Sequence, residues 1–124
     1  MSGRWRVMRN ADTGAVLLAR VRWCDSAWCR FRGLMLRGTL APDEGLLLVY
    51  GHASVVGSSI HMFFMRFAIA VLWLDEEFRV VSKTLAKPWR PYYAADSPAQ
   101  YILEAPPTLL DSIAVGDRVE FEPQ

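Results

Sequence analysis

One stretch in the middle of the chain decides the fold: residues 60–75, IHMFFMRFAIAVLWLD. Its second half, residues 67–74, is apolar throughout, as a buried β-strand requires. In an extended chain, alternate residues point to the same side, so one face would carry Phe67, Ile69, Val71 and Trp73. The longest apolar run, residues 62–74, is interrupted by Arg66 and is far shorter than the roughly 20 apolar residues of a transmembrane helix. We therefore predict a buried strand and no membrane span.

Shorter patterns on both sides of this stretch predict further strands and a few turns. The strands that we predict are residues 4–7, 15–23, 45–50, 59–62, 67–74, 78–85, 100–104 and 118–122. Turn-forming residues at 10–14 join the first two strands into a hairpin, with Gly14 free to adopt positive φ. A short helix is expected after a cap at Asp25 or Ser26, with Trp28, Phe31 and Met35 at helical spacing.

A second short helix is expected to begin at Pro106 or Pro107, because proline is tolerated in a first helical turn. Many short strands with one or two short helices are typical of a mostly β fold. We expect a compact antiparallel β sandwich or flattened barrel. Residues 87–97 hold two prolines and three aromatic residues, which favours an irregular loop.

The composition fits one folded domain over residues 1–124. Hydrophobic residues make up 52% of the chain, which excludes a disordered protein. The formal net charge is +1, so the sequence offers no excess of clustered basic residues for nucleic acid. The N-terminal ten residues lack the apolar core of a signal peptide, and we therefore expect a cytoplasmic protein.

The two cysteines, Cys24 and Cys29, are expected to be reduced thiols. Their spacing would place them on different faces of a helix, and no second Cys/His pair follows at zinc-finger distance. A Cu(I) site is conceivable from the soft ligands His52, His61, Met62 and Met65 together with the cysteines. Methionines inside an apolar stretch are more often core residues, so we expect no metal and no cofactor.

Four segments carry a family resemblance when they are taken in order. They are residues 32–37 (RGLMLR), 45–50 (GLLLVY), 60–75, and 101–104 (YILE) with the later Gly116-Asp117 turn. Through these segments the chain resembles the domain-of-unknown-function 192 family, also called UPF0127, over residues 21–121. The resemblance implies a jelly-roll-like β domain without an established activity. Some members of that family carry leader peptides, which implies export for those members.

The chain departs from the family pattern at three places. Ala70 stands where the family has an aspartate, and Ala68 stands where it has a proline. Residues 105–108 (APPT) replace a glycine-bearing segment. The missing aspartate removes the most obvious carboxylate of the shared site, so a function that depended on it would be lost here.

His61 and Glu104 are the first polar residues to consider, because each interrupts an apolar stretch. His61 could be a general base, a ligand or a hydrogen-bond donor; equally, a backbone carbonyl could satisfy a strand histidine. Glu104 could reach a ligand, or it could form a structural ion pair with Arg32 or Arg66.

The proline-rich loop offers a second kind of surface. Trp89 and Tyr92, beside Arg90 and Lys87, would form the aromatic and cationic surface that sugar or peptide binders use. Alternatively, the loop packs its own aromatic rings over one end of the fold.

These residues favour a non-catalytic binding or accessory module that takes a small molecule or a glycan. We expect the ligand-binding residues to be Arg32, His61, Arg66 and Glu104 in a polar pocket, with Trp89 and Tyr92 at its rim. No catalytic residue is assigned in this reading. One alternative is a small hydrolase or lyase with His61 as base and Glu104 as its orienting partner. Another is a structural role with a protein partner in an envelope or pilus assembly.

Overall fold

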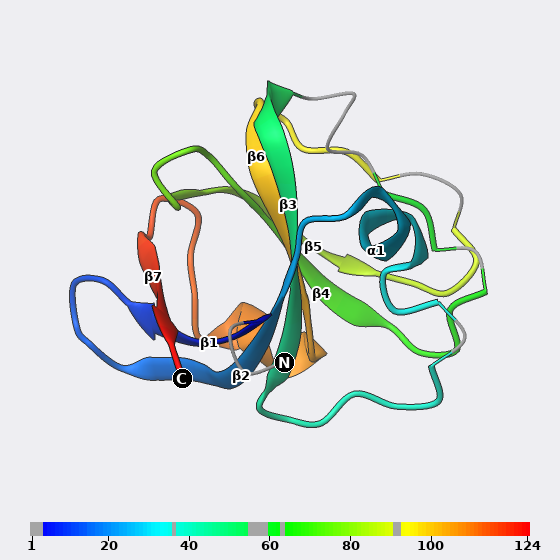
Figure 1. The fold of residues 1–124 in the computed structure, drawn as a ribbon, viewed down its shortest axis with the longest axis horizontal. Coiled ribbons are helices and arrows are strands. Elements are labelled where there is room, and N and C mark those ends of the chain that lie inside the picture. The colour runs from blue at the N-terminus through cyan, green and yellow to red at the C-terminus, as the bar shows by residue number, and fades with distance from the viewer. Residues whose placement is uncertain (1–3, 36, 55–59, 63, 91–92) are drawn as a thin grey trace.

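The computed structural model describes residues 4–35, 37–54, 60–62, 64–90 and 93–124. Its strands and helices, in chain order, are β1 (Trp5–Asn10), β2 (Val16–Cys24), α1 (Ala27–Arg32), β3 (Glu44–Ser54), β4 (Ile69–Leu74), β5 (Val80–Ala86), β6 (Ala99–Ala105), the 3₁₀-helix η2 (Pro107–Asp111) and β7 (Val119–Pro123). In Figure 1, β3 and β6 run through the centre, with α1 on one side and β1 and β7 on the other. Within the described ranges, no helix is long and apolar enough to cross a membrane.

The strands form one mixed sheet in the order β5-β4-β6-β3-β2-β1-β7. The mostly β fold class is therefore confirmed, but the described strands form an open mixed sheet, and neither a sandwich nor a closed barrel is shown. Strands β2 and β3 pair in parallel because residues 25–43, including α1, form a crossover between them. Every other pairing is antiparallel. Strands β5 and β7 are the last strands at the two ends of this order. Arg79, just before β5, and Arg118, just before β7, form one isolated bridge.

Both faces of the middle strands are buried, and each face has its own apolar core. The α1-side core includes Leu46, Leu48, Ile69, Val71, Trp73 and Ile102. The opposite core includes Leu18, Leu47, Leu72, Leu74, Leu103 and Val119. All six residues of β4 are buried, which explains why this strand reads as a continuous apolar run. The predicted face of Phe67, Ile69, Val71 and Trp73 is confirmed, because all four lie in or against the α1-side core.

Helix α1 forms where the capping signal predicted it, but its aromatic residues lie outside the core. Ser26 caps it by accepting a hydrogen bond from the Cys29 amide, and Gly33 ends it at φ 51°. Trp28 and Phe31 are 69% and 60% exposed, and their rings pack on each other at 6.0 Å. Helical spacing alone would have turned them inward; α1 instead rests on the sheet through other contacts.

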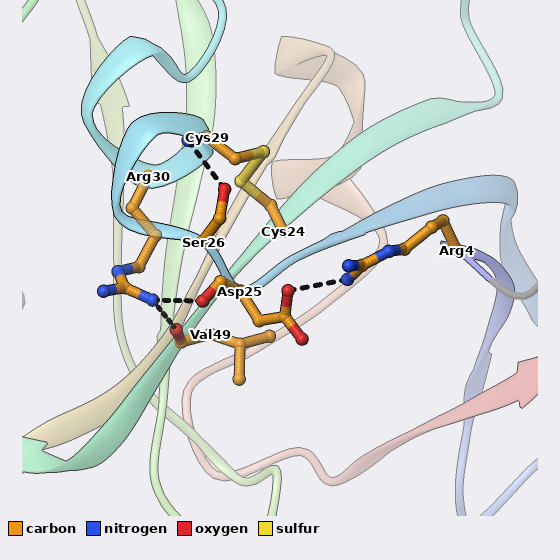
Figure 2. Close-up of a disulfide and its surroundings, with 7 residues drawn as sticks. All are labelled: Arg4, Cys24, Asp25, Ser26, Cys29, Arg30 and Val49. Atoms are coloured by element: carbon orange, nitrogen blue, oxygen red, sulfur yellow. Dashed lines mark hydrogen bonds and ion pairs between the residues drawn. A yellow bond between two sulfur atoms is a disulfide. The ribbon is translucent and has the colours of Figure 1, made fainter. Parts of the chain in front are cut away.

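The expectation of two reduced cysteines is wrong, because Cys24 and Cys29 form a disulfide (Figure 2). The spacing argument assumed that both residues lie on one helix. Cys24 is in fact the last residue of β2, and the turn at Asp25 and Ser26 brings the first turn of α1 back toward it. The two Cα atoms are 5.7 Å apart, a distance that a disulfide spans.

Candidate functional site

A cavity of about 200 Å³ lies between α1 and the sheet face that it covers. The described residues lining it are Arg30, Phe31, Arg32, Gly33, Leu34 and Met35 from α1 and the segment after it, Leu48 and Tyr50 from β3, Glu104 from β6, and Ile60, His61 and Met65 from the segment before β4. Segments that are far apart in the sequence therefore meet at one cavity.

Glu104 is the buried carboxyl group of this cavity. Strand alternation places Glu104 and Ile102 on the α1 side, while Leu103 faces the opposite core. In the sheet, Glu104 lies between Leu46 of β3 and Val71 of β4. A carboxyl group thus stands in the middle of an otherwise apolar face.

This carboxyl group lacks the partner that a buried charge requires. Glu104 is 6% exposed, and its Oε1 is buried and accepts no hydrogen bond from any described residue. Gly33 covers it so closely that a Cβ there would lie 3.1 Å from Oε1. Burial raises the pKa of Glu104 from 4.5 to about 7. The structural ion pair expected with Arg32 or Arg66 is not formed within the described part of the chain.

Glu44 shows how the same protein satisfies a buried carboxylate when the role is structural. Arg37 donates two hydrogen bonds to it at 3.0 and 3.3 Å, and the Ala41 amide donates a third at 3.3 Å. Burial alone would raise the pKa of Glu44, but these hydrogen bonds and the charges of Arg37 and Arg20 lower it below its ordinary value. Glu104, in contrast, has no arginine or backbone amide that would stabilise its charge among the described residues.

Cations from α1 lie along the wall of the cavity. The Arg30 side chain donates to the carbonyl oxygens of Asp25 at 2.6 Å and of Val49 at 3.1 Å, which ties α1 to β3 (Figure 2). Its guanidinium also lies 5.2 Å from the ring centroid of Tyr50. Arg32 is exposed, and within the described ranges no carboxylate pairs with it.

Tyr50 contributes a phenol to the same wall. Burial raises the pKa of the Tyr50 hydroxyl, and the charge of Glu104 adds to this rise while Arg30 opposes it. Arg30, Gly33 and Tyr50 were not predicted from the sequence as site residues. The available signals were the Arg32-Gly33 pair of the family-like block and the position of Tyr50 at the end of an apolar strand.

His61 is held at the cavity by backbone pairing on both of its sides. The amides of Ile60 and Tyr93 donate to each other's carbonyls at 2.8 and 2.9 Å, and the Met62 amide donates to Arg90 at 2.8 Å. The pairing of Ile60 with Tyr93 is an isolated bridge. The strand predicted at 59–62 is therefore observed only as this one pairing, and Ser59 lies outside the described residues. The imidazole is half-buried, with its centroid 6.0 Å from that of Phe31.

The structure thus brings together three of the six predicted ligand-binding residues: Arg32, His61 and Glu104 line one cavity. Arg66 is exposed and does not line it. Trp89 is also outside it, 57% exposed and packed against Phe64 at 5.1 Å between ring centroids. Tyr92 lies outside the described residues.

Of the soft-metal ligands considered from the sequence, Cys24 and Cys29 are joined in a disulfide and offer no free thiolate. Met62 and Met65 are 0% and 4% exposed and belong to the α1-side core. Among the described residues, no three of the His, Cys, Asp and Glu side chains are grouped as a metal site would require.

The fold and the cavity define a class of small, mostly β protein with a polar pocket between a short helix and a mixed sheet. The chain belongs to the DUF192 family, described as an uncharacterized ACR, whose model matches residues 8–121. A UPF0127 protein of Pyrococcus furiosus is 38% identical over 116 residues, covering 92% of this chain and 97% of its own length. The resemblance stated from sequence motifs is therefore confirmed.

Two solved structures share this fold. A Sinorhizobium meliloti protein described as a candidate transcription regulator superimposes with a TM-score of 0.84 at 23% identity, covering 94% of this chain and 92% of its own. A Novosphingobium aromaticivorans protein of unknown function gives a TM-score of 0.80 at 21% identity, covering 93% of this chain and 83% of its own. At 23% and 21% sequence identity, these two similarities establish the fold alone.

Proposed function

We propose that this protein is a non-catalytic binding module that holds a small molecule in the cavity beneath α1. The observation that carries the proposal is Glu104 Oε1, buried at the cavity without a hydrogen-bond partner. A buried unpaired carboxyl group costs folding free energy, and a ligand that donates to it would recover part of that cost. Arg32 and His61 on the same cavity supply further polar contacts.

The size of the cavity limits the ligand. At about 200 Å³ it lies below the roughly 300–1,000 Å³ typical of pockets for drug-sized molecules. A ligand of metabolite size, or a single sugar unit of a glycan, matches this volume. Leu34, Leu48 and Met65 give part of the wall an apolar character, so the ligand we propose carries both polar groups and an apolar portion.

The test is a thermal-shift screen at neutral pH with sugars, amino acids, organic acids, nucleotides and metal ions, applied to the wild type and Glu104→Gln. A ligand for this cavity should raise the melting temperature of the wild type, and the shift should shrink in Glu104→Gln. Glu120→Gln is the matched control, because Glu120 is an exposed carboxylate on β7, outside this cavity. An unchanged melting temperature across the whole panel would refute the proposal.

The hydrolase or lyase reading also has an observation in its favour. His61 and Glu104 line the same cavity, and a carboxyl group with a pKa of about 7 can accept or donate a proton near neutral pH. Each compound that binds should therefore be incubated with the protein and followed by NMR. Turnover that is lost in both His61→Ala and Glu104→Gln would replace the binding role with a catalytic one.

A cytoplasmic location stays a proposal, and the Cys24–Cys29 disulfide argues against it, because disulfides rarely persist in a reducing cytosol. Trapping of free thiols in intact cells distinguishes the two cases: alkylated cysteines indicate a reducing compartment, and protected cysteines an oxidising one.

The structural role in an envelope or pilus assembly also stays a prediction, with the exposed Trp28 and Phe31 as its contact surface.

A further inference from the structure

The cavity beneath α1 is lined by both acidic and basic residues, which favours a ligand that carries both a positive and a negative charge. Glu104 supplies a buried carboxyl group from β6. Arg30 and Arg32 of α1 and His61 of the segment before β4 also line the cavity. A purely cationic ligand would meet repulsion from the two arginines, and a purely anionic ligand would meet repulsion from ionised Glu104.

The buried carboxyl group favours an ammonium group over a hydroxyl. A hydroxyl would give Oε1 one hydrogen bond but would leave the charge of the carboxylate unbalanced. An ammonium donates up to three hydrogen bonds and also neutralises that charge, which matters most where water is excluded. Glu104 Oε1 is buried, so this second contribution is large.

The arginines favour an anion at the other end of the ligand. Arg30 already donates to the carbonyls of Asp25 and Val49, although its guanidinium carries five N–H groups in all. Arg32 makes no ion pair within the described ranges and is exposed beside the cavity. The forked guanidinium matches a carboxylate better than it matches a neutral group.

We propose that the ligand of this cavity is a small zwitterion with an apolar side group, of the amino-acid class, whose ammonium group contacts Glu104 and whose carboxylate contacts Arg32. The apolar group packs on Leu34, Leu48 and Met65. This inference rests on the proposed binding function and names the class of ligand for the same cavity.

Binding of such a ligand should depend on pH. The groups that line the cavity with Glu104 are Arg30 and Arg32 on α1, Tyr50 on β3, and His61. The ammonium binds the ionised form of Glu104, whose pKa burial raises to about 7. Affinity should therefore increase as the pH rises from about 6 to about 8, with release of a proton on binding at the lower pH.

The experiment is isothermal titration of the wild type with valine, leucine and phenylalanine, each beside the acid that lacks its amine and the amine that lacks its carboxylate. For leucine these are isocaproate and isoamylamine. At least one amino acid should bind about tenfold or more tightly than both of its truncated partners, because each partner leaves one charged group of the cavity unpaired.

Variants assign the two ends. Glu104→Gln should remove the preference for the amino acid over the acid that lacks its amine. Arg32→Gln should lower the affinity for the amino acid and for that acid by a similar factor. Glu120→Gln should change neither affinity. If Glu104→Gln does not fold, the comparison of the three ligand types on the wild type at pH 6 and pH 8 still tests the proposal.

The inference fails if the acids bind as tightly as their amino acids, or if Glu104→Gln keeps the preference. Binding of sugars or other neutral compounds in this cavity, without binding of the amino acids, would overturn the zwitterion and leave the proposed function standing. If no compound of either screen binds, both fail.

Discussion

At the level of single residues, the two buried glutamates should respond to pH in opposite directions. The pKa of Glu104 is raised by burial from 4.5 to about 7. Between these values the unfolded chain has released the proton and the folded chain keeps it. The free energy of unfolding therefore falls as the pH rises through this window, and below about pH 4 Glu104 contributes nothing.

Glu104→Gln should therefore be more stable than the wild type at pH 8, by about 3 kcal/mol, because it removes the cost of ionising a buried carboxyl group. At pH 4 the carboxyl group of Glu104 is largely protonated in both the folded and the unfolded chain, so ionisation should add little to the difference in free energy of unfolding between the two proteins. Urea unfolding at both pH values measures the difference. A stability change of the same size at pH 4 and pH 8 would contradict the prediction.

Glu44→Gln should have the opposite effect at neutral pH. The folded-state pKa of Glu44 lies below 4.5, so its contribution to stability is fully present above that value and is lost as the pH falls through the folded-state pKa. The variant keeps one acceptor oxygen but loses one of the two hydrogen bonds from Arg37 and the attraction between the opposite charges, and it should be destabilised by about 1–2 kcal/mol at pH 7. Unfolding curves that overlay those of the wild type at pH 7 would show that this pair contributes nothing.

At the level of elements, helix α1 is held to the sheet by few contacts. Each of its six side chains is exposed or half-buried. Its attachments include the disulfide to β2, the cap by Ser26 and the two hydrogen bonds from Arg30 (Figure 2). Because α1 carries Arg30 and Arg32, the shape of the cavity depends on these attachments.

Opening the disulfide should therefore loosen one wall of the cavity. We expect Cys24→Ser/Cys29→Ser, or the wild type with an excess of a dithiol, to lose about 2 kcal/mol of stability. Any ligand of the cavity should bind more weakly to the open form. Hydrogen exchange checks the location of the change: amides of residues 27–33 should lose protection, while those of β4 should keep it. Equal loss of protection in α1 and β4 would argue against a local role.

At the level of the whole molecule, β4 joins the two cores. Ile69 belongs to the α1-side core and Leu72 to the opposite core, and both are 0% exposed. Since the two cores lie on opposite faces of the same strands, damage on either side should unfold both.

Ile69→Ala and Leu72→Ala should each cost about 2–5 kcal/mol through lost burial and a residual cavity. In both variants, tryptophan fluorescence and far-UV circular dichroism should report one coincident transition. Two separated transitions in either variant would mean that the cores fold independently.

The same scale shows what sequence patterns could and could not predict. Strand β7 was predicted with Val119 inward and Glu120 outward, because alternation is a local property of an extended chain. Parallel pairing of β2 with β3 was not predicted, since it depends on the path of residues 25–43 in space. The disulfide was missed for the same reason: one cysteine ends a strand and the other lies in the first turn of a helix.

The sequence by itself determined the mostly β class, most of the strands, the capped short helix and the family, because backbone periodicity, caps and motif order are written along the chain. The tertiary structure decided which of the marked polar residues meet. Arg32, His61 and Glu104 come together at one cavity, while Arg66 and Trp89 lie outside it. The physical reason is that proximity across strands depends on pairing order and on how α1 folds back over the sheet, and neither is encoded in the spacing of residues along one segment.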